Sequence, residues 1–224
     1  IKNLGHIVGS GSHGADPDKV AAIQKLSRPQ SKHLLKSFLG LCNYYRDYIP
    51  HYSEVVLPLT ELTKKRCPEE LTWKENHEIA FQSVKRCLME ATSLSTPVLG
   101  VPFVIQCDAS STGIGGCLSQ RKDGVLHPIS YASQKLTKAQ QAWPTIEREA
   151  YAVIWSLKKF ETWIFGSPIE LITDHNPLTF VSKNAPQSSK LQRWALALQK
   201  YNISITHCPG VKLANADALS RLNC

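Results

Sequence analysis

Acidic side chains are few in the second half of this chain, and three of them occupy positions where an acid needs a partner. Residues 101–224 hold eight Asp and Glu. Asp108 follows an apolar run that ends at residue 107, Asp174 follows another that ends at residue 173, and Asp217 lies in a stretch of small residues. Because removing a lone carboxylate from water is costly, each of these acids needs a cation or several hydrogen-bond donors.

Divalent cations are suitable partners for acids placed in this way. Mg²⁺ prefers oxygen ligands, and two ions about 4 Å apart can stabilise the attacking and leaving oxygens of a phosphodiester. The pattern therefore favours either a metal-dependent phosphodiesterase or a set of structural acids that cap turns and pair with lysines. The spacing of the acids does not choose between these alternatives.

The apolar periodicity predicts the elements that would carry these acids. Short alternating runs indicate strands, and apolar residues at helical spacing indicate helices. In the second half we expect strands at 103–107, 113–118, 125–131, 169–173 and 203–207, helices at 144–165 and 189–201, a short helix after residue 177 and a helical turn at 214–222. Three strands followed by alternating helices and strands predict an α/β domain with helices packed on a mixed sheet.

The first half of the chain predicts a small helical unit. Its glycine-rich start, residues 1–15, is more typical of a hairpin than of a phosphate-binding loop, and helices are expected at 19–26, 31–49, 53–62 and 75–91. Polar, proline-containing stretches follow residue 66 and span 96–102. We therefore expect a helical region at 1–66, a connecting helix and linker at 67–101, and the α/β domain at 102–224.

The composition indicates a protein that binds a polyanion inside a cell. Lys and Arg number 26 against 18 Asp and Glu, a net charge of +8, which favours nucleic acid as a partner. No apolar run approaches the roughly 18–20 residues that span a bilayer, so a membrane partner is not expected. The seven cysteines include no C-x-x-C pair, which favours a reducing compartment such as cytoplasm or nucleus. The chain starts without Met and without a signal-like segment, as expected for a fragment or a processed product.

Four ordered motifs in the second half resemble the RNase H domain of gypsy-like LTR retrotransposons. They are Gln-Cys-Asp-Ala-Ser at 106–110, Trp-Pro-Thr-Ile-Glu-Arg-Glu at 143–149, Thr-Asp-His-Asn-Pro-Leu at 173–178, and Asn-Ala-Asp-Ala-Leu-Ser-Arg at 215–221 after Pro209-Gly210. Residues 1–66 resemble the end of the adjoining reverse transcriptase, with its primer-grip hairpin at 4–8 and its thumb at 38–46. The polymerase motif Tyr-x-Asp-Asp is absent from the sequence, so polymerisation by this chain alone is not expected.

The resemblance implies an RNase H-like fold with a mixed five-stranded sheet, preceded by a thumb-like helical unit. It implies a two-metal endonuclease that hydrolyses the RNA strand of RNA–DNA hybrids and leaves 3′-hydroxyl and 5′-phosphate ends. The cofactor would be two Mg²⁺ ions, for which Mn²⁺ can substitute. The implied metal ligands and catalytic acids are Asp108, Glu149, Asp174 and Asp217.

The helix position has two candidates, Glu147 and Glu149. At about 100° per residue they flank opposite sides of the expected apolar stripe, so periodicity leaves both open. The family motif selects Glu149, because the catalytic Glu directly precedes the small apolar run at 150–153.

His207 and several basic residues complete the predicted site. His207 lies ten residues before Asp217, the spacing of a mobile His that assists proton transfer or product release in related RNases H; the alternative is an ordinary surface histidine. The basic residues expected to hold phosphates are Lys135, Lys138, Lys183, Lys190 and Arg193.

Two other functions compete with a hybrid nuclease. The chain could be a domesticated, non-catalytic nucleic-acid-binding module that keeps the fold, although all four predicted acids are present. It could also be a fragment that works only with the polymerase fingers and palm supplied as a partner. Oligomeric state is not predicted by the sequence.

Overall fold

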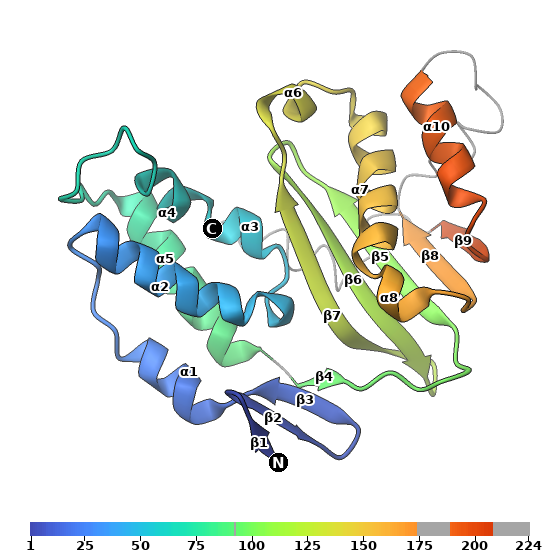
Figure 1. Ribbon diagram of the computed structural model, residues 1–224, viewed down its shortest axis with the longest axis horizontal. Helices are drawn as coiled ribbons and strands as arrows, with labels where there is room; N and C mark the ends of the chain where they lie inside the picture. The colour runs from blue at the N-terminus through green and yellow to red at the C-terminus, as the bar shows by residue number, and fades with distance from the viewer. Residues whose placement is uncertain (92, 174–188, 208–224) are drawn as a thin grey trace.

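The N-terminal half folds as a short sheet beside a group of helices (Figure 1). The structure is a computed structural model, and it describes residues 1–91, 93–173 and 189–207. Four strands form an antiparallel sheet in the order β1-β2-β3-β4. The bounds are β1 Lys2–Asn3, β2 His6–Gly9, β3 Ser12–Ala15, β4 Leu94–Ser95, α1 Pro17–Gln24, α2 Lys32–Tyr44, the 3₁₀ helix η1 Arg46–Tyr48, α3 Tyr52–Val55, α4 Leu57–Leu62 and α5 Glu75–Glu90.

Local sequence signals set the starts of α1 and α2. The Asp16 carboxylate caps α1 by accepting from the Asp18 N–H at 3.1 Å, and Pro17 occupies the first turn. The Ser31 hydroxyl caps α2 by accepting from the Leu34 N–H at 3.2 Å. The expected hairpin at the start of the chain is confirmed by the β2–β3 pairing.

The helix expected at 31–49 ends earlier, at Tyr44. Tyr45 leaves the helical conformation (φ −101°, ψ 15°), and its buried ring turns toward the hairpin, where its hydroxyl donates to the Gly5 carbonyl at 3.0 Å. Tyr48 then hydrogen-bonds His6 and His13 at 3.0 and 2.9 Å. These contacts with the hairpin explain why the α-helix ends at Tyr44 and is followed by the 3₁₀ helix η1.

One apolar core joins the whole N-terminal half. Its side chains come from α1 to α4, from η1 and from α5, and they include the fully buried Leu35, Ile49, Leu59, Phe81 and Leu88. The helix assigned to a connecting segment, now α5, therefore packs in the same core as residues 1–66. The boundaries at 66 and 101 stay a prediction.

The second half contains the expected mixed five-stranded sheet, in the order β7-β6-β5-β8-β9. Strands β5 to β7 are antiparallel, whereas β8 runs parallel to both β5 and β9. The bounds are β5 Phe103–Ala109, β6 Gly113–Lys122, β7 Val125–Lys135, β8 Ile169–Thr173, β9 Ile203–His207, α6 Lys138–Gln141, α7 Thr145–Lys159, α8 Glu161–Ile164 and α10 Ser189–Leu198.

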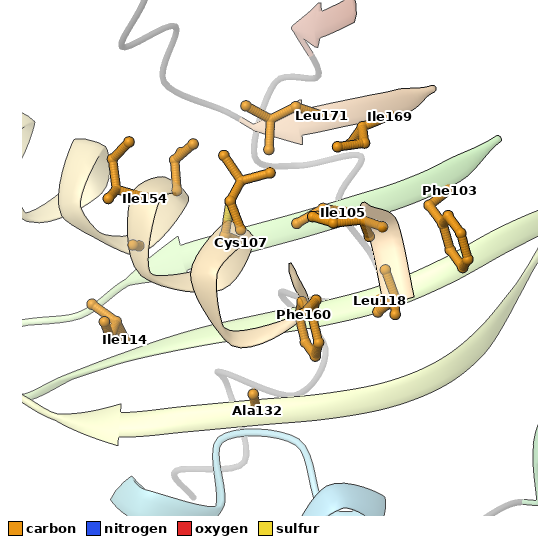
Figure 2. Packing of buried hydrophobic residues seen from close by; sticks show 14 of the residues in the cluster. Phe103, Ile105, Cys107, Ile114, Leu118, Ala132, Ile154, Phe160, Ile169 and Leu171 are labelled. Carbon is orange, nitrogen blue, oxygen red and sulfur yellow. The ribbon is translucent and has the colours of Figure 1, made fainter. Parts of the chain in front are cut away.

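Helix α7 covers one face of this sheet. The alternating side chains of Phe103, Ile105 and Cys107 pack in a core with the buried stripe of α7, as Figure 2 shows. The helix expected at 144–165 is interrupted at Phe160, which leaves helical geometry (φ −96°, ψ 8°) while its ring stays buried in this core. By the alternation of a strand, Val104, Gln106 and Asp108 belong to the opposite face of the sheet.

The N-terminal half lies against that opposite side, at the β7 edge. Strand β7 contacts η1, α3 and β4, and the partly buried Tyr131 packs against the N-terminal core. Figure 1 shows α3 placed between the other N-terminal helices and the sheet. None of the described helices is long and apolar enough to cross a bilayer. The five cysteines of the described ranges are all free thiols.

Candidate active site

Asp108 lies inside β5 rather than beyond its end. The ladder between β5 and β6 continues through Asp108 opposite Gly115 and Ala109 opposite Ile114, so the strand is two residues longer than expected. The apolar run that predicted the strand stops at residue 107 because the next residue is the acid itself, and the last two strand positions are only half buried. Asp108 is therefore held by a paired backbone near the carboxyl end of the central strand.

Glu149 lies on the buried side of α7, one turn before Ala152 and Val153. It is only 5% exposed, although periodicity placed it at the margin of the apolar stripe. Arg148, the neighbour of Glu149, anchors this turn of α7 to the residue that follows β5, because its guanidinium donates to the Ser110 carbonyl at 2.7 Å. The helix and the strand that carry the two acids are thus joined directly.

Glu147, the other glutamate of α7, pairs with a lysine of α10. Its carboxylate forms an ion pair with Lys190 of α10 at 3.0 Å, and the Lys190 ammonium also lies over the Trp143 ring, 4.1 Å from its centre. The Glu147 side chain is 13% exposed. This pair ties α7 to α10, and it distinguishes the surroundings of the two glutamates, which helical periodicity could not do.

The carboxyl ends of three parallel strands share one edge of the sheet. The register pairs Gln106 of β5 with Ile172 of β8, and Thr173 of β8 with His207 of β9. Thr173, the residue before Asp174 in the sequence, is 1% exposed at this edge. Asp174 and Asp217 lie outside the described residues, and so does the His207 side chain.

The predicted phosphate-binding residues differ in their surroundings. Lys135 pairs with Glu61 of α4 at 2.6 Å, and Lys190 pairs with Glu147. The Lys135 and Lys64 ammonium groups lower the pKa of the Glu61 carboxyl to about 2. Lys138 and Arg193 are exposed, and Lys183 lies outside the described residues.

The described acids suit a hard cation in chemistry but do not form a complete site by themselves. Within the described ranges, no three His, Cys, Asp or Glu side chains gather closely enough to hold a metal ion. Asp108 and Glu149 supply carboxylate oxygens, which Mg²⁺ prefers. The donor type therefore fits Mg²⁺, and the other two implied ligands belong to ranges that the structure does not describe.

Sequence reasoning missed the residues that support the turn after Asp108. Ser110 accepts the N–H groups of Thr112 and Gly113 at 3.1 and 2.9 Å, and its hydroxyl donates to Glu54 of α3. The Ser-Ser-Thr-Gly stretch at 110–113 is a local turn signal that could have indicated this geometry. The contact with Glu54 has no local signal.

Comparisons with known proteins agree with this architecture. A family model of the RNase H-like domain found in reverse transcriptase matches residues 99–201. The chain is similar to the retrovirus-related Pol polyproteins of the Drosophila melanogaster transposons opus (37% identical over 99% of this chain) and gypsy (35% over 100%). It spans 23% and 22% of their lengths.

Solved structures show the same fold. A foamy viral protease-reverse transcriptase in complex with an RNA/DNA hybrid matches 93% of this chain and 29% of its own length, with a TM-score of 0.76 and 22% identity. A foamy viral protease-reverse transcriptase dRH in complex with double-stranded DNA matches 93% of this chain and 37% of its own length, with a TM-score of 0.79 and 22% identity. At 22% identity these likenesses concern the fold alone.

Proposed function

Because this chain belongs to the gypsy-like retrotransposon reverse transcriptases, with an RNase H-like domain at 99–201, we propose that it hydrolyses the RNA strand of RNA–DNA hybrids. It would act as the C-terminal part of a longer reverse transcriptase, with Mg²⁺ as cofactor. The observation that carries the proposal is the placement of the two helix glutamates. Glu149 is buried beside the strand end that carries Asp108, whereas Glu147 is held by Lys190.

The roles of the chain's own residues follow from their positions. Asp108 and Glu149 would hold metal, together with Asp174 and Asp217. Two bound Mg²⁺ ions would activate a water molecule and neutralise charge on the phosphate. Arg148 keeps the start of α7 on the end of β5 through the Ser110 carbonyl, so the two described acids keep a fixed relation.

Substrate selection rests on the geometry of the hybrid. A hybrid displays 2′-hydroxyl groups in a wide minor groove, and contacts to them distinguish RNA from DNA. The exposed Lys138 and Arg193 are the described candidates for phosphate contacts. His207 stays a candidate for proton transfer, because its backbone pairs with Thr173 at the edge where β8 ends.

The test compares labelled RNA–DNA, RNA–RNA and DNA–DNA duplexes, each with Mg²⁺, with Mn²⁺ and with a chelator. We expect cleavage only of the RNA in the hybrid, and only with metal. Equal cutting of all three duplexes, or no cutting with either metal, would contradict the proposal. Tight hybrid binding without cutting would instead support a non-catalytic nucleic-acid-binding module.

A further inference from the structure

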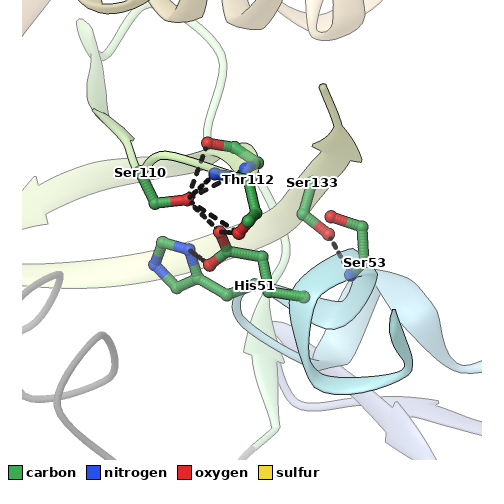
Figure 3. Close-up of polar contacts among 7 residues, drawn as sticks. His51, Ser53, Ser110, Thr112 and Ser133 are labelled. Carbon is green, nitrogen blue, oxygen red and sulfur yellow. Dashed lines mark hydrogen bonds and ion pairs between the residues drawn. The ribbon is translucent and has the colours of Figure 1, made fainter. Parts of the chain in front are cut away.

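The two halves of the molecule meet on the turn that follows Asp108. Figure 3 shows Ser110 and Thr112 of this turn facing His51 at the start of α3. One Glu54 carboxylate oxygen accepts from the Ser110 hydroxyl and from the Thr112 hydroxyl, the latter at 3.1 Å. On its other side the turn is held by Arg148, which donates to the Ser110 carbonyl. The turn is therefore clamped between α7 and the N-terminal half.

Two glycines of β6 allow this close approach. A Cβ atom at Gly113 would lie 2.8 Å from Glu54 Cγ, and a Cβ atom at Gly115 would lie 2.8 Å from Cε1 and Nδ1 of the His51 ring. Gly115 is the strand partner of Asp108, and directly paired residues project to the same face of a sheet. The His51 ring thus fills the space that a side chain at position 115 would occupy next to Asp108. His51 and Asp108 both line a cavity of about 50 Å³.

The backbone at His51 is adapted to this contact. Its φ of 49° lies in the left-handed region, which is unfavourable for a residue other than glycine. His51 accepts the N–H groups of Glu54 and Val55 through its carbonyl, at 2.9 and 3.2 Å, and its Nδ1 lies 3.6 Å from the Glu54 carboxylate. Conformational strain of this kind persists where the surroundings over-determine it. His51 and Glu54 therefore act as one unit, with side chains 14% and 26% exposed.

We propose that Glu54, supported by His51, is a positioning residue of the RNase H centre: it fixes the 110–113 turn and, through it, the end of β5 that carries Asp108. The proposal rests on the proposed nuclease function. It gives residues 1–66, which resemble the end of a reverse transcriptase with its thumb, a role in nuclease turnover. A nuclease centre would then be fully ordered only when the N-terminal half is docked.

Four variants of the full chain test this role. Glu54→Ala removes the acceptor, whereas Glu54→Gln keeps an oxygen that can accept from Ser110 and Thr112. Gly113→Ala leaves Glu54 in the sequence but places a methyl group 2.8 Å from its Cγ, and the flexible side chain can move away with little loss of stability. Ser133→Ala is the matched control, because it removes another hydrogen bond of the same interface, from the Ser53 N–H at 2.8 Å, without touching the turn.

We expect kcat for hybrid cleavage at saturating Mg²⁺ to fall about 10- to 100-fold in Glu54→Ala and in Gly113→Ala, as for residues that orient metal ligands. The Michaelis constant should stay within about twofold, since phosphate contacts are unchanged. Glu54→Gln should restore most of kcat, and combining Glu54→Ala with Gly113→Ala should be no worse than Glu54→Ala alone. The proposal is overturned if both single variants keep wild-type kcat, or if Ser133→Ala loses as much.

Amide hydrogen exchange separates this inference from the nuclease proposal. The Thr112 and Gly113 N–H groups bond to the Ser110 hydroxyl that Glu54 holds, so both should exchange faster in Glu54→Ala and in Gly113→Ala than in the wild type or in Ser133→Ala. Unchanged exchange would overturn the positioning role even if the chain cuts hybrids. If the variants exchange faster but the wild-type chain cleaves no hybrid, the contact between Glu54 and the 110–113 turn is supported and the nuclease proposal is refuted.

Discussion

The substitution Glu149→Gln separates metal binding from folding, because it removes one charge at nearly constant volume. Glu149 is 5% exposed on the sheet-facing side of α7, so the neutral amide occupies the same buried space. If Glu149 is a metal ligand, the variant loses a hard anionic donor. A loss of about 3 kcal/mol of transition-state stabilisation corresponds to roughly 100-fold or more in cleavage rate.

A stability measurement gives an independent readout of the same ligand. At a Mg²⁺ concentration 100 times the dissociation constant, binding stabilises a protein by about 2.7 kcal/mol, which raises the Tm of a chain of this size by roughly 5–10 °C. We expect this Mg²⁺-dependent rise in Tm in the wild type. Most of the rise should be lost in Glu149→Gln. Without metal, Glu149→Gln should fold normally, since the amide has nearly the same volume as the carboxylate and fills the same buried space.

Glu147→Gln is the matched control on the same helix. It breaks the ion pair with Lys190, which is partly exposed, so the cost should be about 1 kcal/mol or less and independent of Mg²⁺. Its cleavage rate should remain close to that of the wild type. If Glu147→Gln abolishes cleavage and the Mg²⁺-dependent rise in Tm while Glu149→Gln spares both, the assignment of the helix ligand is wrong by two residues.

Three further outcomes are expected. Phe81→Ala should lower the free energy of unfolding in urea by about 3–5 kcal/mol, because Phe81 is 1% exposed in the N-terminal core. Met89→Ala, at 62% exposure on the same helix, should change it little. Equal effects of the two substitutions would contradict the packing of α5. A fragment of residues 67–224 should self-associate in size-exclusion chromatography more than one of residues 97–224, since only the former exposes the buried face of α5. For Glu61, the lysine partners lower the pKa of the folded carboxyl from 4.5 to about 2. Its contribution to stability should therefore be complete above pH 4.5 and disappear as the pH falls toward 2, so the difference between wild type and Glu61→Gln in chemical unfolding should shrink over this window; a difference that grows would refute the link.

Strands β8 and β9 and the caps of two helices were predictable because their causes are local, whereas β5, β6 and β7 each run two to four residues past their predicted ends. Strands β8 and β9 have the predicted bounds, since each is a short apolar run between breaks. The caps at Asp16 and Ser31 follow from side chains that bond to N–H groups two or three residues away. The mixed sheet followed from the alternation of strands and helices, and its five strands from the family resemblance, whereas the strand order was not predicted.

Features that depend on distant partners were not predictable. The early end of α2 at Tyr44 depends on hydrogen bonds to a hairpin about 40 residues earlier in the chain, at Gly5. The ion pair of Glu147 depends on Lys190 of another helix, a partner that helical periodicity does not reveal. The Glu54 clamp on Ser110 joins two halves of the molecule that carry no common sequence pattern.

The strand order also determines when the central strand becomes complete during synthesis. Strands β5, β6 and β7 are neighbours in the chain and can pair as soon as they emerge, because hairpins form within about 1–10 μs. The other edge of β5 waits for β8, which follows only after α7 and α8. Until then a nascent chain presents the backbone of its most apolar strand unpaired, which is a template for association with other chains. Ribosome-bound intermediates that stop before residue 169 should therefore depend most on chaperones.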